Sequence, residues 1–244
     1  GGPLARQDAS SSLSLRLSTD ARRSVVGFAS GQHLRSELGR VRTAIEGGVE
    51  LRPSDALVVS LEPSVVVEGD PRQYVTALAD PAAQATFGTR YVFGQLDATS
   101  VALAARVDWT FMPRLSLQLF VRPFASRGQI SAFKEAYRPG ALRFLEYGTE
   151  RGRGTENADG STRIDPGDGG AAFTLARDFT VRSLQGNAVL RWEYRPGSAF
   201  FFVWQQQRGG FADDGRLRVG RDLRGLFTDT PTNVFLVKVS HWIG

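Results

Sequence analysis

Apolar and polar residues alternate along most of the chain, and this period of two predicts β-strands rather than helices. In the segment 184–194, Leu190 and Trp192 fall on one face, while Arg191 and Glu193 fall on the other. The same alternation predicts about eleven strands, over residues 13–17, 24–33, 41–52, 56–68, 72–79, 84–95, 98–111, 115–127, 182–195, 199–210 and 232–243. The sequence therefore predicts an all-β protein.

The connections between the predicted strands are of two kinds. Four are tight, at 19–24, 52–56, 111–115 and 195–199, and three of these carry a proline that presets turn geometry. Two others are long, at 128–180 and 209–231, and are rich in Gly, Asp and Arg. Short turns at one end and long loops at the other are typical of an outer-membrane barrel, with the turns in the periplasm and the loops outside the cell.

Aromatic residues collect at the short-turn end of the predicted strands. Trp109 and Phe111 precede one turn, Trp192 and Tyr194 precede another, and Trp242 lies near the C-terminus. Amphipathic rings prefer the level of the lipid headgroups, so outer-membrane barrels carry such a girdle at each interface. The predicted fold class is thus an antiparallel transmembrane β-barrel spanning residues 1–244, or the C-terminal eleven or so strands of a larger barrel.

An odd number of strands does not close into a bacterial barrel of the usual even kind. An open sheet in hydrocarbon would expose unpaired backbone groups, which is too costly. We therefore expect closure by further strands of the same polypeptide or by another envelope subunit, with the lipid bilayer as the second partner.

The face opposite the apolar one carries charges of both signs. In a barrel these side chains would point into the lumen, where they form either salt bridges that brace the wall or a polar pore with mild anion preference. The residues are Arg16, Arg42, Glu46, Glu50, Arg52, Glu62, Glu68, Arg90, Arg106, Asp108, Arg122, Arg191 and Glu193.

Composition narrows the function classes. The 244 residues contain no cysteine and two histidines, and the net charge of +5 comes almost entirely from arginines that are interleaved with acids. Such dispersed charge argues against nucleic-acid binding, which uses a clustered basic patch. No apolar run approaches the roughly 20 residues of a spanning helix, and no signal peptide is visible. We expect the chain to be mature or to start partway through a longer protein.

Candidate chemistry is sparse, and we predict no catalytic, cofactor-binding or metal-binding residues. The segment 156–170 places Asp159, Asp165 and Asp168 among glycines, which could form a calcium loop but more simply forms a solvated outer loop. His33 has serines nearby in sequence, yet the G-x-S-x-G pattern of a hydrolase is missing. The segment 152–157 resembles a phosphate loop without its lysine or its preceding strand.

Two blocks carry a resemblance to a known family: "ATSVALAARVDWTFMPRLSLQLFVRPF" (98–124) and "DFTVRSLQGNAVLRWEYRPGSAFFFVWQQQR" (178–208). They resemble the C-terminal barrel region of a bacterial family that joins a carbohydrate-binding-module-family-9-like domain to an outer-membrane β-barrel. The resemblance covers residues 70–244 well and the first seventy weakly. It implies a carbohydrate-binding-like domain upstream, a location in the cell outer membrane, and no catalytic residue that could be carried over.

These observations lead to one main expectation and two alternatives. The main one is a non-enzymatic outer-membrane barrel that acts as a pore, as a conduit for export or uptake, or as an anchor for an upstream domain or partner complex. One alternative is a soluble all-β protein that binds or acts on carbohydrate. The other is a surface hydrolase built on a barrel scaffold.

Overall fold

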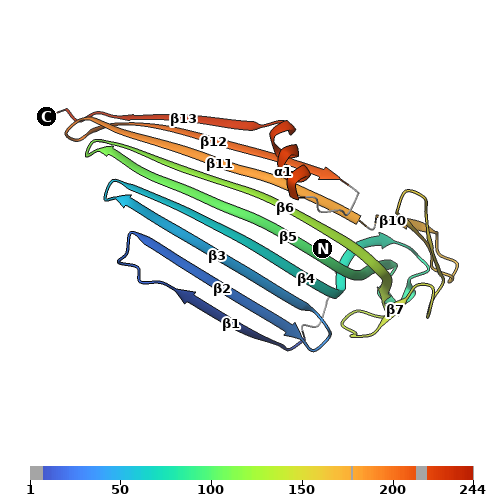
Figure 1. Ribbon diagram of the computed structural model, residues 1–244. Helices are drawn as coiled ribbons and strands as arrows, with labels where there is room; N and C mark the ends of the chain where they lie inside the picture. The colour runs from blue at the N-terminus through green and yellow to red at the C-terminus, as the bar shows by residue number, and fades with distance from the viewer. Residues whose placement is uncertain (1–7, 177, 213–218, 244) are drawn as a thin grey trace.

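Nine long strands follow one another in chain order across a single antiparallel sheet (Figure 1). The computed structural model describes residues 8–176, 178–212 and 219–243. The nine strands are β1 (Ser10–Ser18), β2 (Val25–Ser36), β3 (Val41–Ser54), β4 (Leu57–Ala79), β5 (Thr89–Met112), β6 (Leu115–Ala136), β11 (Asp178–Arg195), β12 (Ser198–Ala212) and β13 (Thr232–Ser240). The prediction of an all-β, antiparallel fold is confirmed.

In two places, two successive predicted strands form one continuous strand in the structure. The predicted count of eleven strands was therefore wrong. The segments 56–68 and 72–79 together form β4, and the segments 84–95 and 98–111 contribute to β5. In β4 the pairing register shifts between Asp70 and Gln73, which is where Pro71 interrupts the strand. A bulge accommodates a proline because a bulged residue does not pair with the neighbouring strand. The missing N–H of proline therefore costs no hydrogen bond at that position. The strand therefore continues through a sequence that favours a turn.

The four predicted tight turns all connect neighbouring strands as hairpins, and they lie at one end of the sheet beside the C-terminus (Figure 1). At the turn between β11 and β12, Gly197 takes a positive φ of 76°, and Ser198 accepts a hydrogen bond from the backbone N–H of Trp242 at 3.0 Å. The opposite end carries the short connection 37–40, the segment 80–88 with a 3₁₀ turn (η1, Gln84–Thr86), and the two long connections.

The strand register aligns the apolar positions into rows that cross the sheet. One row runs over six consecutive strands through Leu57, Trp109, Leu117, Leu190, Phe202 and Val237. We call this side of the sheet the apolar face and the other side the polar face. Among the described residues no second sheet covers the apolar face, so that Leu119 is 38% exposed and Val237 is 59% exposed. A sandwich would bury these side chains, and the structure does not form one.

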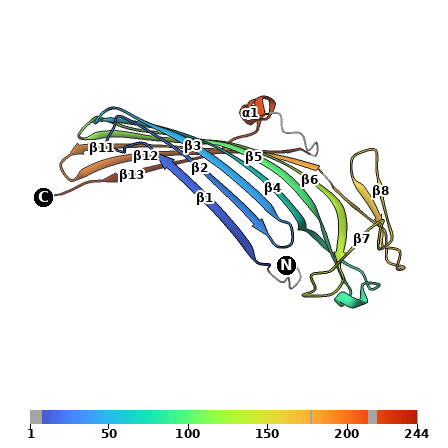
Figure 2. The ribbon, with the colours of Figure 1, turned by 60° about the horizontal axis from the view of Figure 1, so that its bottom comes forward.

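The large sheet is open. β1 and β13 are its two edges, and in the described part of the chain no pairing joins them. Because every neighbouring pair is antiparallel and the path has nine strands, β1 and β13 run in the same direction. Figure 2 shows the sheet bent into a trough, and a closed barrel is not formed.

About half of the segment predicted as a long loop, 128–180, is in strands. Its two ends belong to β6 and β11, β7 (Phe144–Glu146) pairs with β6, and a separate three-stranded sheet contains β8 (Arg153–Glu156), β9 (Thr162–Asp165) and β10 (Phe173–Leu175). A small core joins this segment to the ends of β5 and β6; its buried members are Val92, Phe133, Tyr147, Ile164 and Leu175. We call residues 137–176 the cap.

The second long connection contains the helix α1 (Val219–Thr228), which lies against β6, β11 and β12. Figure 2 shows it over the convex side of the bent sheet. No helix among the described residues is both long enough and apolar enough to cross a membrane.

Candidate functional site

The polar face of the sheet carries ion pairs between neighbouring strands and within strands. Arg42 on β3 lies opposite Glu68 on β4, with Nε and Oε2 3.8 Å apart. Arg191 and Glu193 pair along β11 at 3.3 Å. These pairs are partly exposed, so each adds little to the stability of the fold. Both pairs lie on the polar face, so they concentrate charged side chains on one side of the sheet.

Three arginines of the same face have no carboxylate partner within the described residues. The guanidinium of Arg16 lies 4.0 Å from the centre of the Phe28 ring, and that of Arg106 lies 5.9 Å from the Phe120 ring. No ion pair is seen for Arg122 in this part of the chain either. Glu46, Glu62 and Asp108 on this face also have no ion pair in this part of the chain, and Asp108 lines the same hollow as Arg106. The polar face therefore keeps unpaired charge of both signs, which requires contact with water.

Amide side chains form a neutral patch between the charged positions. Asn187 pairs in register with Gln205, and Gln185 pairs with Gln207, so the four amides lie on adjacent positions of β11 and β12. Together with Phe120 they line a shallow hollow of about 290 Å³. The patch offers many hydrogen-bond donors and acceptors without net charge.

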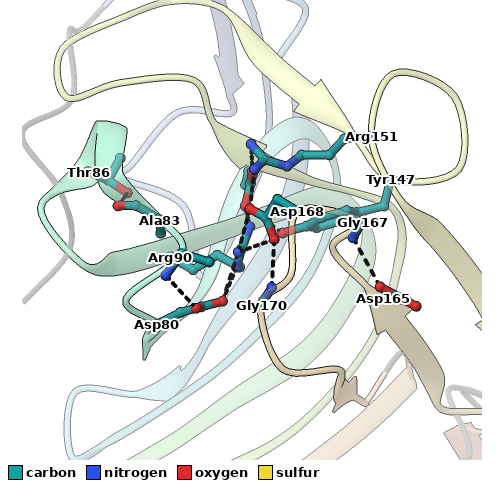
Figure 3. A network of polar contacts seen from close by, with 12 residues as sticks. Asp80, Ala83, Thr86, Arg90, Tyr147, Arg151, Asp165, Gly167, Asp168 and Gly170 are labelled. Carbon is teal, nitrogen blue, oxygen red and sulfur yellow. Dashed lines mark hydrogen bonds and ion pairs between the residues drawn. The ribbon is translucent and has the colours of Figure 1, made fainter.

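A buried group of charged residues holds the cap onto the sheet (Figure 3). The Arg90 side chain, 1% exposed, donates to Asp80 Oδ2 at 2.8 Å, to Asp168 Oδ2 at 2.9 Å and to Glu135. Arg151 bonds to Glu135 Oε1 at 2.5 Å and to Asp168. We call Asp80, Arg90, Glu135, Tyr147, Arg151 and Asp168 the Arg90 cluster. The sequence pattern grouped Arg90 with the charges of the polar face, and this was wrong, because the cap covers it.

The cluster shifts the proton affinities of its members. Burial lowers the pKa of the Arg90 guanidinium, but hydrogen bonds to Asp168, Asp80 and Glu135 outweigh it and the net shift is upward. Burial alone would raise the pKa of the Asp168 carboxyl, yet Arg90 and the backbone N–H of Gly170 lower it overall. Burial and the negative charge of Glu135 raise the pKa of Tyr147, whose hydroxyl donates to Glu135 at 2.8 Å. The shifts of Arg90 and Asp168 favour their ion pairs, and the shift of Tyr147 keeps its hydroxyl protonated as a donor to Glu135.

The arrangement of the acidic residues does not form the calcium loop considered from the sequence. Asp159 accepts hydrogen bonds from Ser161, Asp165 accepts one from the N–H of Gly167, and Asp168 is held by Arg90 and Arg151. Across residues 8–176, 178–212 and 219–243, no three His, Cys, Asp or Glu side chains gather as metal ligands would. Asp168 is a structural partner of arginine rather than a cation ligand.

The two histidines are bonded to hydroxyl groups rather than to carboxylates. His33 Nδ1 lies 3.0 Å from Thr43 Oγ1 on the neighbouring strand, and His241 Nδ1 lies 2.9 Å from the hydroxyl of Tyr194. Both sites are exposed. A hydrolytic triad needs a base that is oriented by an acid and placed against a nucleophile, and neither histidine has that geometry.

Sequence reasoning missed the Arg90 cluster and α1. The cluster joins residues from the segment 80–88, β5, β6 and the cap, and its bonded pair Arg90 and Asp168 is 78 positions apart, so no local spacing could reveal it. For α1 a local signal exists: the segment 219–228 has apolar residues at helical rather than alternate spacing.

The fold and its surfaces define an all-β protein built on one open antiparallel sheet, with an uncovered apolar face and a charged face. The chain belongs to the family described as Domain of unknown function (DUF5916), which matches residues 2–244. No curated protein and no solved structure matches the chain.

Proposed function

We propose that the sheet is part of the wall of a non-enzymatic outer-membrane β-barrel, with its apolar face against lipid and its polar face lining a water-filled lumen. In this role the chain acts as a pore, as a conduit or as the membrane anchor of an upstream domain. The carbohydrate-binding-module-like domain implied by the sequence resemblance belongs to the same proposal.

The observation that carries the proposal is the uncovered apolar face. It reaches from β1 to β13, and α1 lies over it only where it contacts β6, β11 and β12. Large apolar side chains on this face are exposed, among them Leu15, Ile45, Leu103 and Val239. Burying apolar area is favourable by about 25 cal/mol per Å², so a face of this size in water would be strongly unfavourable. Acyl chains remove that cost without a second protein layer.

The ends of the apolar face support the same orientation. Trp109, Trp192 and Trp242 all lie at the short-turn end and are exposed. Indole rings of this kind favour the boundary between lipid and water. The cap lies at the far end of the sheet, as an extracellular loop region would.

The parallel directions of β1 and β13 determine what can close such a wall. In a fully antiparallel barrel, an odd number of further strands must stand between these two edges. We propose that they come from another part of the same polypeptide or from a second envelope subunit. The pairing partner satisfies the free backbone groups of both edges, which lipid cannot do.

The proposal is tested with the full-length protein in detergent and in lipid vesicles. The 244 residues contain no cysteine, so in a full-length protein freed of any other cysteine single labels can be placed at Leu119 on the apolar face and at the adjacent Gln118 on the polar face. We expect a label at Leu119→Cys to be quenched by lipid-borne quenchers, and a label at Gln118→Cys to be quenched by water-soluble ones. A monomer that stays soluble without detergent, with both labels open to water, would contradict the proposal and favour a soluble all-β protein.

Pore and anchor roles are separated by conductance across planar bilayers. If the lumen is open, its ion selectivity reports which unpaired charges dominate, Arg16, Arg106 and Arg122 or Glu46, Glu62 and Asp108, and a preference for anions would mean that the arginines do. An inserted protein that conducts no ions is an anchor rather than a pore.

A further inference from the structure

The helix α1 lies on the apolar side of the sheet, at the end away from the short turns. Arg182 alternates in phase with Leu184 and Leu190 of β11, and its Nε donates to Asp229 Oδ2 just beyond α1 at 2.7 Å. Arg208 of β12 lies opposite Leu184 in register and donates to the carbonyl of Phe227 at 2.8 Å. Two arginines of the apolar side thus hold the C-terminal end of the helix against the outside of the wall.

The position of these contacts along β11 matches the height of a bilayer. Arg182 is ten residues from Trp192, which is about 33 Å along the strand at the usual rise. A tilt of about 45° reduces this to roughly 23 Å, close to the ~25 Å apolar band of outer-membrane barrels. If Trp192 lies at one interface, α1 lies at the other, in the plane of the headgroups.

The side chains of α1 are divided between its two sides. Asp222 and Leu226 lie one turn apart and are buried, with Leu226 only 1% exposed. Arg224 and Phe227 lie three positions apart on another side; Arg224 is exposed and Phe227 is 73% exposed. The helix therefore presents a large ring and a guanidinium to whatever surrounds the wall.

The described side chains around α1 carry more positive than negative charge. The two aspartates are paired, Asp229 with Arg182 and Asp222 with Arg221. Arg208 donates to backbone carbonyls and to the Gln206 side chain. Arg224 has no ion pair among the described residues. A helix that combines exposed arginine with an exposed aromatic ring is suited to the boundary between anionic headgroups and acyl chains.

We propose that α1 is an interfacial element that binds phosphate-bearing lipid headgroups of the outer leaflet. Arg224 and Arg208 face the headgroup phosphates, and Phe227 enters the boundary with the acyl chains. This inference rests on the proposed function, because it requires the apolar face to lie in a bilayer. It adds a preference for anionic lipid that the sheet alone does not provide.

The experiment uses the full-length protein in vesicles of phosphatidylcholine, with and without phosphatidylglycerol. A polarity-sensitive label is placed at Phe227→Cys, with Arg138→Cys in the exposed part of the cap as the comparison site and Leu119→Cys as the report on insertion. We expect the label at residue 227 to be quenched by headgroup-level quenchers, more strongly when phosphatidylglycerol is present, and the label at residue 138 to stay in water.

Arg224→Gln, in the background of Phe227→Cys, tests the charge. We expect it to weaken the preference for phosphatidylglycerol about fivefold, the usual effect of one arginine near an anionic surface, while Arg138→Gln changes nothing. Equal behaviour of Arg224→Gln and Arg138→Gln would overturn the inference. Loss of the preference on adding inorganic phosphate alone would also overturn it, since the site would then bind a soluble ion.

The outcomes separate this inference from its parent proposal. A quenched label at residue 119 with an unquenched label at residue 227 contradicts only the role of α1. Labels that remain in water at both positions contradict the barrel wall and the lipid site together.

Discussion

Arg90 on β5 and Asp168 in the cap are 78 positions apart in sequence, and their Nη2 and Oδ2 atoms lie 2.9 Å apart. The same guanidinium also meets Asp80 and Glu135, so one buried cation connects the ends of β4, β5 and β6 with the cap. Ionic groups that are nearly removed from water stay charged only when they are paired, so these contacts hold the cap in one place.

Removing Arg90 should release the cap. Arg90→Met leaves Asp80, Glu135 and Asp168 with only Arg151 between them, and breaking a buried pair of this kind costs about 3–5 kcal/mol. We expect rapid proteolysis within residues 137–176 and a lower unfolding midpoint in detergent. The matched control is Arg143→Gln, which breaks an exposed pair with Glu150 at 3.5 Å and should cost less than about 1 kcal/mol. Equal protease resistance of the two variants would contradict the role of the cluster.

Acid should loosen the cap through Asp168. Its pKa is lowered in the folded protein, so its pairing stabilises the cap above the ordinary value of 3.8 and this stabilisation is lost as pH falls below that value. A spin label at Thr149→Cys, in the exposed part of the cap, should become mobile in that range. In Asp168→Asn the mobility should be higher at neutral pH and should change less with acid. A label that stays immobile well below pH 3.8 would mean that Asp168 is not needed.

Alkali should act on the same cap through Tyr147. Its pKa is raised in the folded protein, so the stability that it contributes is complete below the ordinary value of 10.0 and declines as pH rises toward the folded value. Tyr147→Phe removes this decline, at the loss of a hydrogen bond to a charged acceptor worth about 1.5–3 kcal/mol. The measurement is unfolding by denaturant at neutral pH and above pH 10. The wild-type chain should lose stability between these conditions, and Tyr147→Phe should lose less.

A methyl group at Gly128 should disturb the sheet where β6 meets β11. Gly128 pairs with Phe179, whose ring lies over the glycine so closely that an added Cβ would overlap it. We expect Gly128→Ala to lower stability by about 1–3 kcal/mol, as overpacking does. Gly31→Ala on β2 is the control, because a Cβ there meets nothing within 4 Å. Thermal unfolding of both variants gives the comparison, and a larger loss for Gly31→Ala would show that the ring does not limit the site.

The two faces of β6 should respond oppositely to an introduced charge. Leu119→Arg places a guanidinium on the apolar face and should reduce insertion into vesicles, since arginine near the bilayer midplane costs about 2–4 kcal/mol. Gln118→Arg changes the adjacent residue on the polar face and should insert normally. The yield of protease-protected, vesicle-bound protein measures both. Equal insertion would contradict the assignment of the faces.

Most strands were predictable from the sequence because apolar residues fill alternate positions along them. Leu57 on β4, Trp109 on β5 and Leu190 on β11 each belong to an alternating apolar series of their own strand. The register of the sheet brings these three residues into one row. The prediction was wrong at Pro71, because a proline with a glycine two positions before it favours a turn in an isolated segment, while pairing with β5 carries β4 past it as a bulge.

The cap and its buried cluster could not be predicted in the same way. β7 and β10 are three residues long, too short for a period of two to be recognised. The partner of Arg90 depends on how the cap folds back, and a lone arginine on an alternating strand looks the same whether it meets water or three carboxylates.

β5 has 24 residues, whereas an inclined strand needs only about 9–11 to cross the hydrocarbon. In the orientation proposed above, more than half of this strand would project beyond the cell surface as a rigid rim topped by the cap. Solutes, phages and antibodies would then meet folded protein well before they reached the lipid.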